Sequence, residues 1–255
     1  MLQLVTFNLR MDTPEDGRNC FDGRKTMVRR ALETRRPDIV GFQEVLPHMA
    51  DFLRQSLEGY TLVGCGRERD LGGEACSVAF RAERFRLIAM QTFWLSPTPD
   101  LPGTRYAVQS PCPRTAVEVL LEDREEKKVL RVINTHLDHE GAPARRLGLE
   151  QILRHAASAG LFPDAPCAIC GDMNAEPGDE AFACLEGFPG YTCATSGIGV
   201  TYHGYGRVRG SSIDAVFLRG AIRCVRAEKW TEEENGIFLS DHYPVCATLA
   251  FSSGN

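Results

Sequence analysis

Four apolar stretches of this chain each begin or end at a carboxylate, and this arrangement limits its possible folds more than any other feature. Glu44 and Asp172 each end an apolar run. Asp214 opens another run, and Asp241 stands just before the last one. Burying an unpaired carboxylate in a strand costs several kcal/mol. The four acids are therefore expected to converge on a positive charge, and a hard divalent cation is the simplest candidate.

The composition is typical of a globular protein. The chain has 255 residues, of which 43% are hydrophobic and 25% charged, and its net charge is −5. This length allows one large domain or two small ones, and we predict a single domain over residues 1–255. The acidic balance, with a pI near 5.7, argues against the dense basic face that duplex binding needs, although a local basic groove stays open.

The N-terminus predicts a strand and no targeting segment. The stretch 2–9 reads as a strand, and no basic segment precedes a long apolar one. No run approaches the roughly 18 apolar residues of a membrane span. We therefore expect a cytoplasmic protein without a membrane partner.

The ten cysteines follow no regular spacing. Cys76, Cys167, Cys224 and Cys246 fall inside apolar strands, where a reduced thiol acts as a small hydrophobe. Cys167 and Cys170 form a C-x-x-C pair, but no second pair follows at zinc-finger spacing. Buried thiols are favoured over zinc or redox chemistry.

The apolar patterns predict strands, many of them antiparallel, with a few helices between them. Helices are expected over 25–36, 48–57, 142–158 and 180–185. Strands are expected over 2–8, 38–44, 60–65, 75–81, 85–95, 115–121, 129–136, 167–172, 212–219, 222–230 and 245–251. A strand–helix–strand pattern near the start is echoed around 130–172, which fits one domain of two packed sheets with helices outside. The long loops 11–22, 96–113 and 190–211 are expected to be functional.

Two candidate residues lie at the ends of the first two strands. Asn8 is either an amide that orients a metal ligand or contacts a phosphate, or simply a turn former, and alone the turn is favoured. Glu44 is either a carboxylate ligand of Mg²⁺ or a helix-capping acid, and alone the two readings are even.

A histidine cluster follows the strand 129–136. His136 at the strand end could donate to a phosphoryl oxygen or protonate a leaving group. A single histidine here would more often be structural, but Asp138 and His139 beside it favour a site. Zinc is a rival interpretation, although no cysteine lies close in the sequence.

The segment Gly171-Asp172-Met173-Asn174 is the sharpest short motif. The glycine permits a tight exit from the strand. Asp172 could then orient an attacking water, and Asn174 could bind the reacting oxyanion. The alternative is an Asx turn before Pro177-Gly178.

The last acidic pair involves a histidine. A carboxylate bonded to one imidazole nitrogen fixes the tautomer and raises the basicity of the ring. We assign Asp214 to this role beside His242, and Asp241 to metal binding or water orientation. A surface Asp-His before a strand explains the two segments together poorly.

Substrate contacts are predicted in the loops. Arg114 follows Pro113 and opens a strand, so it is the arginine most suited to grip phosphate oxygens. Tyr106, Tyr202 and His203 could stack on a substrate or hydrogen-bond to it.

Taken in order, these residues resemble the endonuclease/exonuclease/phosphatase superfamily, which has the deoxyribonuclease-I-like fold. The loop segments around Trp94, Pro113 and Thr201 are similar to those of its compact bacterial members, although Tyr106 stands where such loops often carry a tryptophan. The pieces that carry the resemblance are Thr6-Phe7-Asn8, Gln43-Glu44, Thr135-His136-Leu137, Gly171-Asp172-Met173-Asn174, Ser212-Ile213-Asp214 and Ser240-Asp241-His242.

The resemblance implies a four-layer α/β sandwich in which two packed, mostly antiparallel sheets are flanked by helices. It also implies Mg²⁺- or Mn²⁺-dependent hydrolysis of a phosphate ester at one end of the sheets. The implied metal site consists of Glu44 with Asn8 and Asp241 nearby. The implied catalytic residues are His136, Asp172, Asn174, Asp214 and His242, and the predicted substrate contacts are Arg114, Tyr106, Tyr202, His203 and Asp138.

Three functions stay open at this point. A phosphodiesterase of the nuclease type is favoured, with a nucleic acid as one candidate substrate. A phosphomonoesterase acting on a sugar or inositol phosphate is the alternative. A catalytically silent binding module belongs to another class, but such modules usually lose site acids, and none is missing here. The sequence predicts no oligomeric state.

Overall fold

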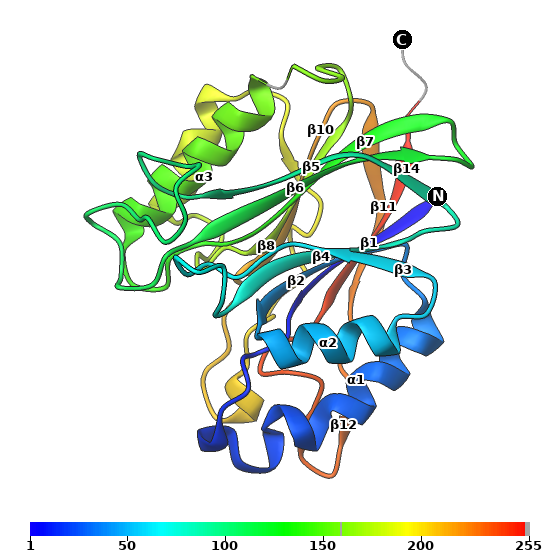
Figure 1. Cartoon of the computed structure of the whole chain (residues 1–255), viewed down its shortest axis with the longest axis vertical. Helices are drawn as coiled ribbons and strands as arrows, with labels where there is room; N and C mark the ends of the chain where they lie inside the picture. Colours follow the sequence, from blue (N-terminus) through cyan, green and yellow to red (C-terminus); the bar gives the residue numbers. More distant parts are fainter. Residues whose placement is uncertain (159, 253–255) are drawn as a thin grey trace.

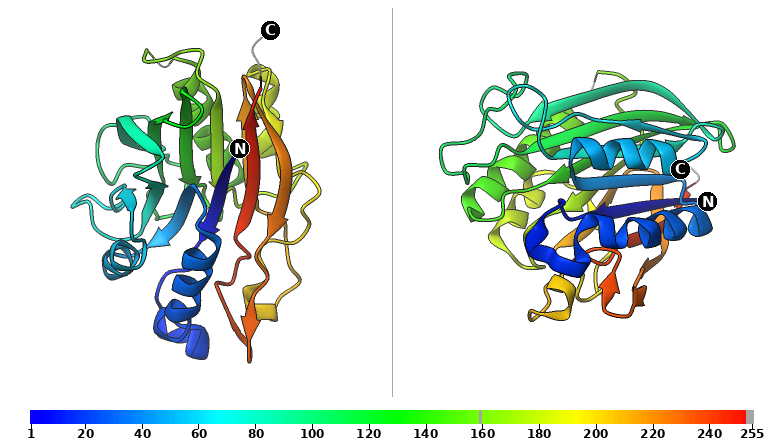
Figure 2. Two further views of the ribbon diagram at one scale, coloured as in Figure 1. Left: turned by 90° about the vertical axis from the view of Figure 1, so that its right-hand side faces the viewer. Right: turned by 60° about the horizontal axis from the view of Figure 1, so that its bottom comes forward.

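A computed structural model describes residues 1–158 and 160–252 of the chain. Two six-stranded sheets pack face to face (Figures 1 and 2). The first has the order β11 (Ile222–Lys229), β14 (Val245–Phe251), β1 (Leu2–Asn8), β2 (Ile39–Val45), β4 (Ala75–Arg81) and β3 (Tyr60–Val63). The second has the order β5 (Phe85–Trp94), β6 (Thr115–Asp123), β7 (Lys128–His136), β8 (Cys167–Asp172), β10 (Asp214–Arg219) and β9 (Thr192–Cys193). A short hairpin of β12 (Glu233–Glu234) and β13 (Ile237–Phe238) lies outside both sheets.

Each sheet is mostly antiparallel but contains one parallel pair. The β1–β2 pair is joined through helix α1 (Phe21–Arg35), and the β7–β8 pair through helix α3 (Ala142–Ala157). A parallel pair needs such a crossover, which a helix usually supplies. The expected sandwich and the repeated strand–helix–strand pattern are therefore both confirmed.

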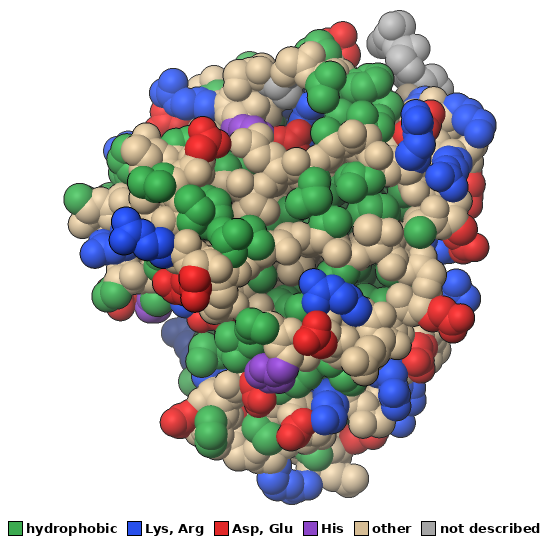
Figure 3. Space-filling model, in the orientation of Figure 1, with side chains coloured by type: hydrophobic (Ala, Val, Ile, Leu, Met, Phe, Trp, Pro, Cys, Tyr) green, Lys and Arg blue, Asp and Glu red, His purple; other side chains and the backbone are tan. Residues whose placement is uncertain are grey.

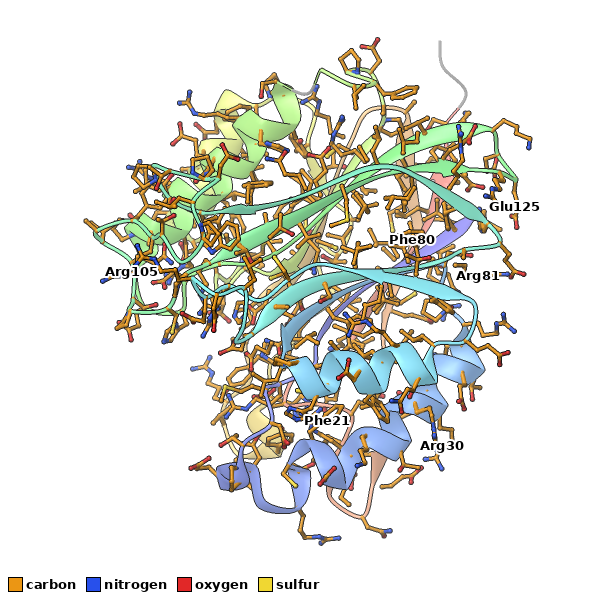
Figure 4. The ribbon with its side chains drawn as sticks, in the orientation of Figure 1. Phe21, Arg30, Phe80, Arg81, Arg105 and Glu125 are labelled. Atoms are coloured by element: carbon orange, nitrogen blue, oxygen red, sulfur yellow. The ribbon has the colours of Figure 1, made fainter. Side chains whose placement is uncertain are left out.

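Three hydrophobic clusters separate four layers. One lies between the sheets and includes Phe80, which is labelled in Figure 4. A second joins the outer face of the first sheet to α1 and to α2 (Pro47–Ser56), where the ring of Phe21 meets Phe52 edge-on at 5.3 Å. The third joins the outer face of the second sheet to α3 and includes Leu149 and Ile152. The central strands of each sheet are therefore buried on both faces, whereas the edge strands β5 and β11 are partly exposed. The strand ends remain free to carry polar side chains.

A buried polar network ties the two sheets together close to those strand ends. Gln43 of β2 donates to Thr6 Oγ1 of β1 (3.1 Å) and to Asn134 Oδ1 of β7 (2.6 Å). Asn134 in turn donates to the carbonyl oxygens of Phe42 and Ser77 in the first sheet. Buried polar groups need such partners, and here they fix the offset between the sheets.

The structure corrects several element boundaries. Helix α1 begins at Phe21, four residues before the expected start, because the Asp12 side chain accepts from the Phe21 N–H (2.9 Å) and so supplies a distant cap. The predicted helix near 180–185 is the 3₁₀ helix η2 (Glu180–Gly187), and two more 3₁₀ turns, η1 (Pro14–Asn19) and η3 (Gly204–Gly206), lie inside predicted loops. The two-residue strands β9, β12 and β13 are too short to leave a sequence pattern.

The cysteines agree with the prediction of reduced thiols. All ten are free, and Cys76, Cys167, Cys170 and Cys246 are buried. Cys224 is only partly buried. None of the helices in the described residues is both long and apolar enough to cross a membrane.

Candidate active site

Strand register brings three predicted residues to the same edge of the second sheet. The parallel pairing of β7 and β8 sets His136 opposite Asp172. The antiparallel pairing of β8 and β10 sets Asp214 opposite the same Asp172. Three segments that are far apart in the sequence therefore deliver their polar side chains to one point.

Asn8 connects this edge to the first sheet. In the parallel β1–β2 pair, Asn8 lies opposite Gln43, immediately before Glu44. The Asn8 Nδ2 group donates to Glu44 Oε1 (3.0 Å) and to Asp172 Oδ2 (3.0 Å). Its Oδ1 accepts from the Arg10 N–H (2.8 Å), which fixes the orientation of the amide. Asn8 thus holds two carboxylates from different sheets at a set spacing.

Asp214 and His242 form a buried pair beside Asp172. His242 Nδ1 lies 2.8 Å from Asp214 Oδ2, and His242 Nε2 lies 3.7 Å from Asp172 Oδ2. Burial alone would lower the pKa of His242, but the negative charges of Asp214 and Asp172 outweigh it, and the pKa is raised above 6.5. The ring is therefore an imidazolium at neutral pH.

Asp172 lies at the centre of the site. Its Oδ1 accepts from the Asn174 N–H (2.9 Å), and its Oδ2 lies 3.4 Å from His136 Nε2. Burial and the charge of Asp214 raise the pKa of Asp172 against the opposing effect of His242. Burial, with the nearby cations, lowers the pKa of His136, so that this ring is neutral. One charged and one neutral imidazole thus flank a carboxyl that can exchange protons near neutral pH.

Glu44 is a carboxylate with only neutral donors. It accepts from Asn8 and from the Met11 N–H (2.8 Å). Burial would raise the pKa of Glu44, but these hydrogen bonds and nearby positive charges lower it instead. Ligand atoms of Glu44, Glu74 and His136 lie within 4.8 Å of one another. This set of oxygen and imidazole donors suits a divalent cation.

Asp241 lies within ion-pair distance of an arginine. Arg10 Nε lies 3.8 Å from Asp241 Oδ2 and 3.0 Å from Asp16 Oδ2. Ser240 Oγ donates to Asp241 Oδ1 (3.1 Å). Burial raises the pKa of Asp241, and the charge of Glu44 adds to this effect, so the two carboxylates are near enough to repel each other.

Arginines and histidines contribute, with the acids, to the lining of a pocket of about 420 Å³ at this edge. Arg114, which is 4% exposed, donates from Nη2 to His139 Nδ1 (2.9 Å). Its buried Nε has no hydrogen-bond partner among the described residues. Arg67 donates to both oxygens of Glu74 (3.0 and 2.6 Å).

Besides Arg114, the structure brings Tyr202 to the pocket, but it does not bring Tyr106 or His203 there. The ring of Tyr202 lies 4.9 Å from that of His242. Tyr106 donates to Gln151 of α3 instead (2.8 Å). His203 is buried and stacks on Tyr243 at 4.0 Å.

Asp138 does not line the pocket but supports it from behind, with its Oδ1 4.0 Å from Nε of the pocket residue Arg114. It is 2% exposed and accepts from the Gly141 N–H (2.7 Å) and from the Ser110 hydroxyl. It therefore ties the β5–β6 loop to the start of α3. Arg105, labelled in Figure 4, lies on the same loop.

The sequence candidates for catalysis or binding did not include several residues that line the pocket, among them Arg10, Arg67, Glu74 and Cys112. Glu74 stands directly before the apolar strand β4, so the pattern used for Asp241 could have found it. Arg10 follows Asn8 by two residues, and its contact with Asp241 joins positions that are far apart in the sequence. Such contacts leave no local signal.

A two-sheet sandwich that gathers carboxylates, imidazoles and guanidinium groups at one edge has the architecture of a phosphoesterase. The chain belongs to the Endonuclease/Exonuclease/phosphatase family, whose family model matches residues 5–242. Members of this superfamily are phosphoesterase hydrolases. The resemblance inferred from the sequence is thus confirmed. A search of curated proteins finds no match.

Solved structures share the fold over the whole chain. An endonuclease/exonuclease/phosphatase from Bacteroides vulgatus is 28% identical with a TM-score of 0.92, covering 98% of this chain and 99% of its own. The mannosyl-6-phosphatase Bt3783 of Bacteroides thetaiotaomicron is 21% identical with a TM-score of 0.88, covering 98% and 100%. Danio rerio TDP2, solved with a single-strand DNA product, is 19% identical with a TM-score of 0.77, covering 98% and 98%. At these last two identities the likeness concerns the fold alone.

Proposed function

We propose that this protein hydrolyses a phosphate ester with the help of a divalent metal ion, Mg²⁺ or Mn²⁺. The observation that carries the proposal is the position of Asp172, held between His136 and His242 and linked through Asn8 to Glu44. A carboxyl that can accept a proton, an imidazolium and an ionised carboxylate are the groups that phosphoryl transfer to water needs.

Glu44 would be the main metal ligand. It is ionised, and both of its oxygens keep free lone pairs because each accepts from one neutral donor. Asn8 would orient this ligand, and Asp241 would stand near the ion. The ion would supply Lewis-acid stabilisation of charge on the phosphoryl oxygens.

The remaining residues would act on the water and the phosphate. Asp172 would orient the attacking water and accept its proton. His242, kept charged by Asp214, would donate to a phosphoryl oxygen, and neutral His136 would donate to another. Asn174 gives one amide hydrogen to the Leu137 carbonyl (3.0 Å), which leaves its second for the developing charge.

Two types of phosphate ester are candidates for the substrate. The sequence favours a diester of the nuclease type, and the buried Arg114, with Tyr202, would then grip the phosphate and a flanking group. A phosphomonoester of a sugar or an inositol is the second candidate, because acids and bases alternate along 67–70, the segment that brings Arg67 to the pocket. Acidic and basic side chains are also interspersed on the face drawn in Figure 3. A long polyanion would need a continuous basic stripe.

Substitution of Asp172 tests the chemistry. Asp172→Ala is expected to fold and to lose hydrolysis by about 100-fold or more, as removal of a key positioning group typically does. The substrates are aryl phosphate mono- and diesters, plasmid DNA, an abasic duplex, poly(A) and sugar phosphates, with Mg²⁺, Mn²⁺ or EDTA. Asp164→Ala is the control, because Asp164 is exposed and precedes the opposite end of β8.

Near-full activity of Asp172→Ala would contradict these roles. Activity that persists in EDTA would contradict the metal. A wild-type protein that shows no heat of binding when divalent metal is added, and hydrolyses none of these esters, would support the silent binding module.

We also propose that residues 1–255 act as one domain, because the pocket takes side chains from strands of both sheets. A cytoplasmic location stays a prediction.

A further inference from the structure

The guanidinium of Arg114 differs from those of two other buried arginines in its partners. Arg24 donates to three main-chain carbonyl oxygens, and Arg131 donates to the Glu118 carboxylate (2.8 Å). Among the described residues, Arg114 hydrogen-bonds to no carboxylate. Asp138 Oδ1 lies 4.0 Å from its Nε, and this Nε has no hydrogen-bond partner. Because a buried cation without a bonded anion is costly, Arg114 is suited to receive an anion from outside the chain.

Within the described part of the chain, the guanidinium of Arg114 makes one hydrogen bond, and its partner is a histidine. Arg114 Nη2 lies 2.9 Å from His139 Nδ1. Since a guanidinium can only donate, Nδ1 accepts, and the ring carries its proton on Nε2. Glu140 Oε1 lies 3.4 Å from that Nε2, on the side where a carboxylate favours the proton. His139 therefore orients the guanidinium without neutralising its charge, as a carboxylate would.

Arg114 and His139 lie on the His136 side of the pocket. All three residues line it. After burial, the positive charge of Arg114 is the largest cause that lowers the pKa of His136, so the guanidinium is close to this ring. A phosphate that accepts from His136 would thus lie beside the free donors of Arg114, and a guanidinium fork matches two phosphate oxygens at once.

We propose that His139 is a positioning residue that holds the Arg114 guanidinium so that its remaining donors bind non-ester oxygens of the substrate's phosphate. This inference rests on the proposed function and adds the residue that sets the direction of Arg114. Arginine has five N–H donors, and the bond to His139 uses only one of them. An arginine without this acceptor would have to be ordered by the phosphate itself, which lowers affinity.

Binding of inorganic phosphate to the full chain tests the inference without any turnover. Isothermal titration calorimetry in Mg²⁺ buffer gives the dissociation constant. Arg114→Ala is expected to weaken phosphate binding by about ten- to 100-fold, which corresponds to the loss of hydrogen bonds to a charged group. His139→Ala should weaken it by about three- to tenfold, the equivalent of one ordinary hydrogen bond, because the guanidinium stays but is no longer oriented.

Two further substitutions of His139 separate the acceptor from the bulk of the ring. Asparagine places its Oδ1 as many bonds from the main chain as Nδ1, whereas glutamine places its oxygen near the position of Nε2. His139→Asn is therefore expected to bind phosphate within about twofold of the wild type, and His139→Gln to resemble His139→Ala. His48→Ala, which removes an exposed histidine of α2 outside the pocket, is the control and should match the wild type.

A double variant tests whether His139 acts through Arg114. In the Arg114→Ala background, His139→Ala should weaken phosphate binding no further, because two residues that serve one interaction do not have additive effects. With an aryl phosphate as substrate, His139→Ala should raise KM more than it lowers kcat. Circular dichroism confirms that each variant is folded, and Arg114→Met replaces Arg114→Ala if the latter is not.

The outcomes separate this inference from the proposed function. Full phosphate affinity of His139→Ala, equal losses in His139→Asn and His139→Gln, or additive losses in the double variant would overturn the role of His139. A wild type that binds no phosphate would overturn it as well. The proposed function is judged separately, by the hydrolysis assays with Asp172→Ala and with EDTA.

Discussion

The Asp214–His242 pair allows a quantitative test of the site electrostatics. Asp214 is 3% exposed and its Oδ2 lies 2.8 Å from His242 Nδ1. The change Asp214→Asn keeps the shape and an oxygen acceptor for the ring but removes the charge. The Asp214 Oδ1 atom is buried and has no hydrogen-bond partner among the described residues. The new amide group would therefore also lose some stability, about 1–3 kcal/mol.

The size of the effect follows from Coulomb's law. With charge centres about 4 Å apart and an effective dielectric of about 20, the pair is worth about 4 kcal/mol, or about 3 pKa units. Asp172 and Asp241 still favour the charged ring, whereas burial opposes it. The pKa of His242 in Asp214→Asn should therefore fall by one to a few units, with about 3 as the upper bound.

The sign of the stability effect follows from the raised pKa. A histidine with a folded pKa above its unfolded value of 6.5 stabilises the fold fully below pH 6.5. This contribution disappears as the pH rises through the folded pKa. In Asp214→Asn that loss of stability should occur at lower pH. If hydrolysis needs the imidazolium, the decline of activity with rising pH should also begin at a lower pH than in the wild type.

The direct assay is a pH titration of ¹³C-labelled histidine by nuclear magnetic resonance in metal-free buffer. The chain has six histidines, and His242→Asn assigns the relevant signal. The other five signals control for the pH scale. If His242 titrates at the same pH in the wild type and in Asp214→Asn, the pair does not set the charge of the ring and the reasoning fails.

Two further predictions concern the fold. A Cβ at Gly171 would lie 2.0 Å from the Thr135 carbonyl oxygen, so Gly171→Ala should destabilise by roughly 3 kcal/mol or more. Gly178→Ala is the matched control, because at φ +95° it meets nothing within 4 Å and should cost only about 1–2 kcal/mol in denaturant unfolding; equal losses would contradict the close approach of β7 and β8. All ten thiols should react with Ellman's reagent in denaturant without prior reduction, whereas a shortfall of two would reveal a disulfide.

The sequence was sufficient for much of the fold because its strands are buried on both faces or alternate cleanly. The acids at strand ends were also predictable as site residues, since burying a carboxylate without a partner costs free energy. Register then placed His136 and Asp214 opposite Asp172, which periodicity alone does not specify. Sheet order depends on contacts between distant segments, and these leave no local pattern.

The loop residues were harder to predict for the same physical reason. Tyr106 and His203 have the chemistry of substrate contacts, yet their rings pack or hydrogen-bond within the protein. Arg67 lies in the pocket because its loop folds back so that the Arg67 carbonyl accepts from Trp94 Nε1 (2.7 Å). A tyrosine or arginine in a loop has many possible neighbours, and only the folded chain selects among them.

The structure shows the turns that the sequence offered as one interpretation of Asn8 and of Asp172. Asn8 Oδ1 accepts from the Arg10 N–H, and Asp172 Oδ1 accepts from the Asn174 N–H, so that each strand ends in an Asx turn. Each turn places its third residue in the left-handed region, with φ of 54° at Arg10 and 47° at Asn174.

Glu44 is left-handed as well, with φ of 59°. Such conformations cost of order 1–2 kcal/mol for each residue other than glycine, and they persist only where the surroundings impose them. All three residues line the same pocket. If these residues served only to end a strand, glycine could replace them without the conformational strain. Arg10, Glu44 and Asn174 instead each have a side chain that reaches the pocket. Other left-handed residues, such as Leu71 and Lys127, lie outside this pocket. The backbone strain at Arg10, Glu44 and Asn174 is therefore consistent with an active site at this edge but does not identify it alone.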